Sequence, residues 1–315
     1  MSARRGLISS FLSCTTFFAF ACGALLTALL GSVLGETGSE SWGWRVAIAV
    51  SAPLGLIGFY LRLRIDETPG FRRLEAERNI TRAPLSEALR TRGRRMAELC
   101  VFFLGIFYMS YLLVGYIPTY LVTNLELSSG TARYSNAAAI VFLVACFPLF
   151  GHLSDRIGRR PVAIIGCCLL LVCTIPAFLL IRSGDLGLLL LGQCLLVLPI
   201  AALNPLNALF MSELFPTRIR YSASAISYNV AAMLAGGTAP FLATFLVAES
   251  GTTLAPAFYA TIIGIVSLLA ALRLPETFRV SLFDDPLAEA VPAGASERFA
   301  SEPPARARRR AWRGS

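Results

Sequence analysis

The sequence predicts an all-α polytopic membrane protein with eight transmembrane helices. Hydrophobic residues make up 56% of the chain, charged residues only 15%, and the mean hydropathy is +0.66. This composition is far from that of a soluble domain. A helix needs about 20 mostly apolar residues to cross a bilayer. Stretches without Asp, Glu, Arg or Lys occur at 6–35, 46–61, 99–125, 134–154, 161–181, 186–212, 221–248 and 250–272.

The first two stretches are predicted to form a pair of spanning helices. The stretch 6–35 follows two arginines, as the core of a signal peptide would, but it is roughly twice as long as such a core. Its small and hydroxylated residues favour close helix packing in lipid. The stretch 46–61 is short, and Arg62 and Arg64 extend it because their side chains can reach the membrane surface.

Residues 70–96 form a long charged segment after the second stretch. The segment is rich in arginine, and Phe71, Leu74, Leu85 and Leu89 stand at roughly helical spacing. This pattern predicts a linker at the membrane interface, part of which is an amphipathic helix. A solvated basic loop is the alternative interpretation.

Two short charged turns separate later stretches. The first, at 151–160, contains Gly151 and Gly158, which permit close backbone approach or a positive φ. A carboxylate beside the start of a neighbouring helix would gain from the helix dipole. The charged residues of the first turn are Asp155, Arg156, Arg159 and Arg160, and those of the second are Glu213, Arg218 and Arg220.

The arginines predict the orientation in the membrane. All 28 basic residues are Arg. With a cytoplasmic N-terminus, 24 of them lie in cytoplasmic segments, Arg62 lies at a span end, and Arg45, Arg133 and Arg182 lie outside. The excess of arginine on one side places both termini in the cytoplasm. The net charge of +9 therefore reflects topology, since no basic face with interleaved aromatics indicates nucleic-acid binding.

The sequence indicates neither a metal site nor catalysis. The eight cysteines fall inside apolar stretches without a C-x-x-C pair, and a single histidine cannot complete a zinc site. No nucleophile and base can be paired, so we do not expect an enzyme.

The pattern G-x-L-x-D-R-x-G-R-R at 151–160 resembles the signature of the major facilitator superfamily, the twelve-helix secondary transporters. W-G-W-R, E-L-F-P-T-R-I-R-Y-S and G-G-T-A-P resemble its metabolite–proton symporter group, which includes shikimate, α-ketoglutarate, citrate and proline/betaine permeases. The resemblance implies proton-coupled symport of a small organic acid or zwitterion across a bacterial inner membrane. The proton is then the coupling ion, with no other cofactor. The resemblance also implies a gate of breakable ion pairs that involves Asp155, Arg159, Glu213 and Arg220.

An internal repeat, L-R-[IL]-x-E-T, occurs at 63–68 and 272–277. Two predicted spans precede the first copy and six more precede the second, so equal halves would place four further helices before Met1. The predicted division is 1–69 for the last two helices of an N-terminal half, 70–96 for the linker, 97–280 for a C-terminal six-helix half, and 281–315 for a disordered cytoplasmic tail. The alternative function is a truncated, non-transporting membrane remnant or scaffold of the same family.

The substrate cavity is expected to use neutral polar groups, because the spans contain no charged residues. Each such group is equally suited to hydrogen bonding between helices. The expected partners are a small metabolite and the lipid bilayer, and the sequence leaves the oligomeric state open. The cavity candidates are Tyr108, Tyr111, Tyr116, Gln193, Asn204, Asn207, Tyr228 and Asn229.

Overall fold

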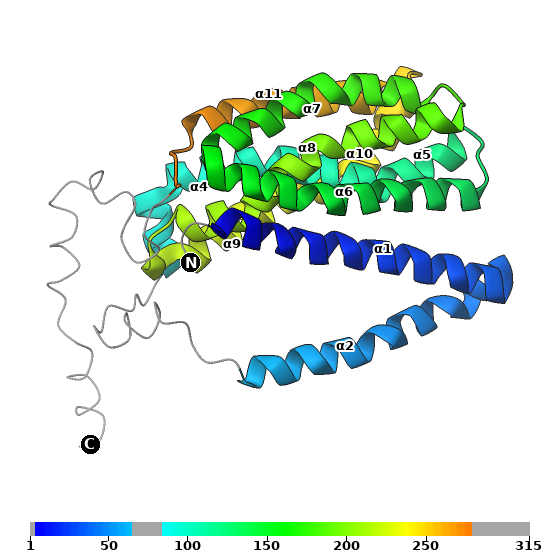
Figure 1. Cartoon of the computed structure of the whole chain (residues 1–315), viewed down its shortest axis with the longest axis horizontal. Coiled ribbons are helices and arrows are strands. Elements are labelled where there is room, and N and C mark those ends of the chain that lie inside the picture. Colours follow the sequence, from blue (N-terminus) through cyan, green and yellow to red (C-terminus); the bar gives the residue numbers. More distant parts are fainter. Residues whose placement is uncertain (1–3, 65–83, 279–315) are drawn as a thin grey trace, which may run out of the picture.

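The computed structural model describes residues 4–64 and 84–278, and these parts of the chain are helical without a strand (Figure 1). The helices are α1 (Arg5–Gly38), η2 (Ser39–Gly43), α2 (Trp44–Arg64), α4 (Pro84–Tyr111), η3 (Leu112–Tyr116), α5 (Ile117–Thr123), α6 (Ser129–Ile157), α7 (Arg159–Ile181), α8 (Leu186–Glu213), α9 (Thr217–Ala231), η4 (Ala232–Gly237), α10 (Ala239–Ser250) and α11 (Ala255–Arg273).

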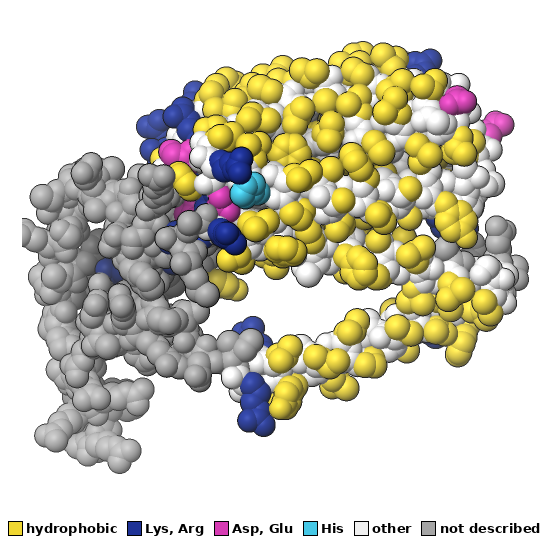
Figure 2. All heavy atoms as spheres, viewed as in Figure 1, with side chains coloured by type: hydrophobic (Ala, Val, Ile, Leu, Met, Phe, Trp, Pro, Cys, Tyr) yellow, Lys and Arg dark blue, Asp and Glu magenta, His cyan; other side chains and the backbone are white. Residues whose placement is uncertain are grey.

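The predicted fold class is confirmed. The described residues contain eight helical segments that are long and apolar enough to cross a membrane. One of these spans consists of α4, η3 and α5, and another consists of α9, η4 and α10. Apolar side chains cover the sides of the helices in Figure 2, as expected for a surface in contact with lipid.

The linker prediction is only partly within the described residues. Residues 84–96 are helical and continue directly into the apolar part of α4, with a kink at Arg92. The rest of the linker, the ends of the predicted halves at 69 and 280, the last four residues of the first repeat copy, and the tail 281–315 lie outside the described residues.

In two spans a π-helical turn, η3 or η4, joins two α-helices of the same span. In each case the next helix carries a proline in its first turn, Pro118 in α5 and Pro240 in α10. Proline is favoured there because it has no N–H to donate and its φ is already helical. The wider turn before it absorbs the change in hydrogen-bond register. By contrast, α8 remains one helix although it contains Pro199 and Pro205.

Helices α4 to α11 form one bundle with α8 packed against α6 and α7. The helix α4 packs against α9 and α11, and α7 also contacts α11. Small residues allow close approach: a Cβ added at Gly166 of α7 would lie 2.6 Å from the Leu203 side chain of α8. Such contacts drive helix association in lipid, where burial from water is not available.

The two N-terminal helices have different surroundings. Helix α1 lies along α6 and α8, whereas α2 diverges from the bundle in Figure 1 and buries none of its side chains. The N-terminal end of α1 meets the turns 151–160 and 213–220 at one end of the bundle. We call this end the arginine-rich end.

Candidate functional site

The first charged turn is reduced to a single residue between two helices. Gly158 separates α6 from α7 with φ of 103°, a conformation that side-chain-bearing residues rarely adopt. This sharp link puts Asp155 in the last turn of α6 and Arg159 at the first position of α7. Both side chains are almost fully buried, with 4% and 1% of their area exposed.

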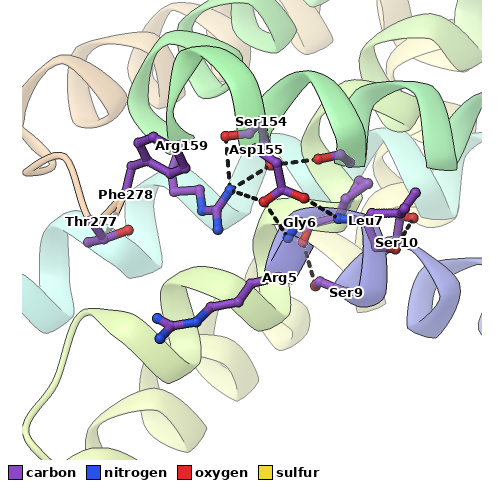
Figure 3. Close-up of polar contacts among 12 residues, drawn as sticks. Arg5, Gly6, Leu7, Ser9, Ser10, Ser154, Asp155, Arg159, Thr277 and Phe278 are labelled. Atoms are coloured by element: carbon purple, nitrogen blue, oxygen red, sulfur yellow. Dashed lines mark hydrogen bonds and ion pairs between the residues drawn. The ribbon is translucent and has the colours of Figure 1, made fainter. Parts of the chain in front are cut away.

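The Asp155 carboxylate caps the N-terminal end of α1. Its two oxygens accept the backbone N–H groups of Gly6 at 2.7 Å and Leu7 at 2.9 Å (Figure 3). These donors belong to the first turn of α1, which lacks partners within its own helix and carries the positive end of the helix dipole. The contact joins α1 to the bundle across 148 or more residues of sequence.

Arg159 connects the two charged turns. Its guanidinium lies 2.8 Å from Asp155 and 3.4 Å from Glu213, and it also donates to the Ser154 carbonyl at 2.8 Å. The Phe278 ring lies 5.4 Å from the guanidinium carbon, within cation–π range. Charge-assisted hydrogen bonds of this kind are about twice as strong as neutral ones, and together they compensate the cost of burying Arg159.

Glu213 is the second buried carboxylate of the site, with 2% of the residue exposed. Besides Arg159, it accepts a hydrogen bond from the Thr277 hydroxyl at 2.8 Å and lies 3.6 Å from Arg5 of α1. The helix α1 therefore meets both Asp155 and Glu213, the first through its backbone and the second through Arg5.

The second copy of the L-R-[IL]-x-E-T repeat holds the turn in place. Glu276 accepts the backbone N–H groups of Arg159 and Arg160 at 2.8 and 3.0 Å. The Arg160 guanidinium in turn donates to the Leu272 carbonyl at the end of α11. The repeat thus supplies Glu276 and Thr277 to the network, roles that the sequence alone did not assign.

The remaining charged residues of the predicted gate lie at its edge. Arg218 pairs with Glu87 of α4 at 3.1 Å, and the Arg220 side chain donates to the Phe215 carbonyl at 3.0 Å. Arg156 and His152 are exposed on α6. The structure brings Asp155, Arg159 and Glu213 together in one buried network. Their gating role stays a prediction.

Close backbone approach makes the cap possible. A Cβ added at Gly151 of α6 would lie 2.6 Å from the Gly6 carbonyl and 2.7 Å from the Ser10 side chain. A Cβ added at Gly6 would collide with the Gly151 carbonyl in return. Further along, the Ser9 hydroxyl donates to the Pro205 carbonyl of α8 at 2.8 Å. The small residues of α1 thus make the close packing that their pattern predicted.

The cavity candidates divide into two groups. Tyr108, Tyr116 and Gln193 are buried inside the bundle; Tyr108 donates to the Pro256 carbonyl at 3.2 Å, and Gln193 to the Ser135 hydroxyl at 3.2 Å. These contacts connect neighbouring helices, which suits a structural role.

The second group is partly open. Tyr111 is exposed, Asn204, Asn207 and Tyr228 are half-buried, and Asn229 is exposed but donates to Ala225 of its own helix. The Asn204 amide donates to Ser110 of α4 at 3.1 Å, and the Tyr228 ring stands edge-on to Phe107 at 4.8 Å. We therefore retain Tyr111, Asn204, Asn207 and Tyr228 as the substrate-face candidates.

Comparison with known proteins identifies the family. The model for the sugar (and other) transporter family matches residues 7–91 and 72–285, which is most of the chain. The chain belongs to this family of the major facilitator superfamily. The proline/betaine transporter of Escherichia coli K12 is 32% identical over 308 residues, or 95% of this chain. The glycine betaine/proline/ectoine/pipecolic acid transporter of Dickeya dadantii is 33% identical over the same share.

A solved structure supports the same fold. The proton:xylose symporter XylE superposes with a TM-score of 0.66 at 21% identity, over 88% of this chain and 65% of its own. The chain spans about 60% of the length of the two curated relatives above. These relatives are transporters, which confirms the prediction of a multi-pass membrane protein of this superfamily rather than an enzyme.

Proposed function

We propose that this protein is a secondary active transporter that couples proton movement to the symport of a small organic acid or zwitterion. The observation that carries the proposal is the Asp155 cap on the first turn of α1. Alternating access requires two groups of helices that separate and rejoin without breaking either one. A carboxylate on one helix and free N–H groups on another can part in this way, because water can take over both sides.

The names of the relatives suggest the substrate class. Proline, glycine betaine, ectoine and pipecolic acid are small zwitterions, and they are transported by the relatives that carry their names. We propose a zwitterion as the first substrate to test, bound against Tyr111, Asn204 and Tyr228. We propose proton coupling because the charged motifs resemble those of the metabolite–proton symporter group.

We further propose that the arginine-rich end faces the cytoplasm of a bacterium, with the protein in the inner membrane. The asymmetric distribution of arginine supports this orientation. The Asp155 cap would then close the cytoplasmic side, and the substrate face would be reached from outside when the cap is formed.

The test is uptake into proteoliposomes that contain the purified chain. Radiolabelled proline and glycine betaine are supplied with an inward proton gradient, with and without a protonophore. We expect uptake that follows the gradient and that falls several-fold in Asp155→Asn. The matched control is Asp185→Asn, because the Asp185 carboxylate caps the exposed start of its own helix, α8, at 2.9 Å.

Two results would contradict the proposal. Uptake that ignores the proton gradient would exclude symport. Folded wild-type protein that binds neither solute and moves neither would favour the alternative, a non-transporting membrane scaffold of the same family.

A further inference from the structure

An open groove of about 350 Å³ lies between α4 and α11 near the arginine-rich end. It is outside the network of Asp155, Arg159 and Glu213. Figure 1 shows α11 on the side of the bundle opposite α1 and α2, so the groove lies away from both N-terminal helices. Its walls include Arg94, Glu98 and Val101 of α4, and Val266, Leu269 and Arg273 of α11.

The two walls have the same order of polarity. Arg94, Glu98 and Val101 follow one face of α4, and Val266, Leu269 and Arg273 follow one face of α11, at spacings of three and four residues. Arginine and valine are seven positions apart on each wall, which corresponds to about 10 Å along a helix. On each wall, therefore, a guanidinium group lies at one end and apolar side chains lie the same distance along the helix from it.

The charged end of the groove has an excess of positive charge. Glu98 is 8% exposed and is held by Arg94 at 3.0 Å and Arg95 at 2.7 Å. Arg94 nevertheless keeps 85% of its side chain exposed. Arg273 is exposed, and within the described residues its guanidinium makes no ion pair. Arginines thus outnumber the single carboxylate, and two of them face outward.

The end of α11 would normally repel an anion, because the last carbonyls carry the negative end of the helix dipole. Here two of these carbonyls are already bound. Arg95 donates to the Arg273 carbonyl at 2.9 Å, and Arg160 donates to the Leu272 carbonyl. The arginines therefore offset the dipole at the mouth of the groove.

The apolar end of the groove is open to its surroundings. Val266 is 39% exposed and Leu269 is 52% exposed, on a helix long and apolar enough to span a membrane. Such side chains face lipid tails in a membrane protein. A diacyl phospholipid has the matching order of groups, with a phosphate above two acyl chains.

We infer that this groove is a binding site for an anionic phospholipid. Arg94 and Arg273 bind the headgroup phosphate, and one acyl chain lies against Val101, Val266 and Leu269. Basic pockets between transmembrane helices favour anionic headgroups, and guanidinium groups suit the geometry of phosphate oxygens. This inference does not depend on the proposed transport function, since it concerns a different face of the bundle.

The test is lipid binding to the delipidated, purified full chain in detergent, followed by native mass spectrometry. Phosphatidylglycerol is expected to bind more tightly than phosphatidylcholine. The double variant R94Q/R273Q is expected to weaken phosphatidylglycerol binding roughly tenfold or more. The control R133Q/R182Q removes the same charge from exposed positions elsewhere and is expected to leave binding nearly unchanged.

A second variant tests the apolar wall with every arginine present. Val266→Trp fills the groove and is expected to reduce phosphatidylglycerol binding. If R94Q/R273Q fails to fold, this variant alone tests whether the groove binds the lipid. The inference is overturned if both variants bind like wild type, or if R133Q/R182Q weakens binding equally. It is also overturned if sn-glycerol 3-phosphate, which lacks acyl chains, binds as tightly as phosphatidylglycerol.

Discussion

The Glu276 carboxylate accepts the backbone N–H of Arg159 at 2.8 Å and so caps the first turn of α7. The residue at the N-cap position is Gly158, which has no side chain for this purpose. The cap therefore comes from the segment after α11, 117 positions further along the chain. The same segment supplies Thr277 to Glu213. Residues directly after α11 thus hold the turn that presents Asp155 to α1.

Removing this cap should destabilise the bundle. We expect Glu276→Ala to lower the free energy of unfolding by about 1–2 kcal/mol, the upper range for a helix cap, because two N–H groups lose their acceptor. Chemical unfolding in detergent, followed by circular dichroism, measures the change. Asp185→Ala is the comparison, since it removes a single local hydrogen bond at an exposed helix start. An unchanged midpoint for Glu276→Ala would contradict the assigned role.

Gly158 should tolerate no side chain. A Cβ there would lie 2.6 Å from the Glu276 carboxylate, and φ of 103° disfavours any other residue. We expect Gly158→Ala to lower the free energy of unfolding by more than the roughly 1–3 kcal/mol that backbone strain alone would cost. Gly184→Ala isolates the strain, because Gly184 has φ of 81° and open space around it. In the double variant Gly158→Ala/Glu276→Ala the added methyl group no longer meets the Glu276 carboxylate. The loss in free energy of unfolding should therefore be smaller than the sum of the losses in the two single variants.

Replacing Arg159 should destabilise the protein more than replacing any other side chain of the network. Arg159→Met leaves Asp155 and Glu213 buried without their common partner, and breaking a buried ion pair costs about 3–5 kcal/mol. The double variant Arg159→Met/Glu213→Gln should lose less free energy of unfolding than the two single variants lose in sum. Arg156 is exposed, so the free energy of unfolding of Arg156→Met should stay within about 0.5 kcal/mol of the wild-type value. Equal losses for Arg159→Met and Arg156→Met in thermal unfolding would refute this account.

The sequence predicted the spans because long apolar segments are the main signal for a transmembrane helix. It also located Asp155 and Arg159 in a short turn, but their partners are distant in sequence. The N–H groups that bind Asp155 belong to Gly6 and Leu7. Because nearly every residue has a backbone N–H, the sequence cannot show which ones bind a distant carboxylate. Glu276 belongs to the second copy of the internal repeat, and the repeat pattern by itself gives this residue no role. Spatial proximity, rather than residue type, supplied the missing information.

The substrate face was harder to predict for a different reason. Helix α8 is apolar around most of its circumference, so the pattern cannot show which face is turned inward. Gln193 and Asn204 therefore looked equivalent in the sequence. In the structure Gln193 is fully buried, whereas Asn204 is half-buried beside Ser110.

The orientation can be measured with fusion reporters. Alkaline phosphatase fused after Arg45 should be active, because we expect this residue outside the cytoplasm. Green fluorescent protein fused after Arg64 or Phe278 should fluoresce, since both positions are predicted to be cytoplasmic. Fluorescence from a fusion after Arg45 would reverse the proposed orientation of the arginine-rich end.

The close approach of α1 and α6 should depend on two glycines that lack room for a methyl group. Gly6→Val would drive a side chain into the Gly151 backbone, which cannot yield as a flexible side chain can. We expect α1 to move away from α6 and the Asp155 cap to break. Spin labels at the exposed positions Phe11 and Leu149, in a chain without native cysteines, would report a longer distance by pulsed electron paramagnetic resonance.

The matched control lies on the same helix. Gly23 has nothing within 4 Å of an added Cβ, so Gly23→Val should leave the distance between the labels unchanged. If Gly6→Val also leaves it unchanged, the contact does not require glycine, and the Asp155 cap would have to be held by Arg5 and Ser9. If only Gly6→Val lengthens the distance, backbone contact at the arginine-rich end is what lets one carboxylate hold two helices together.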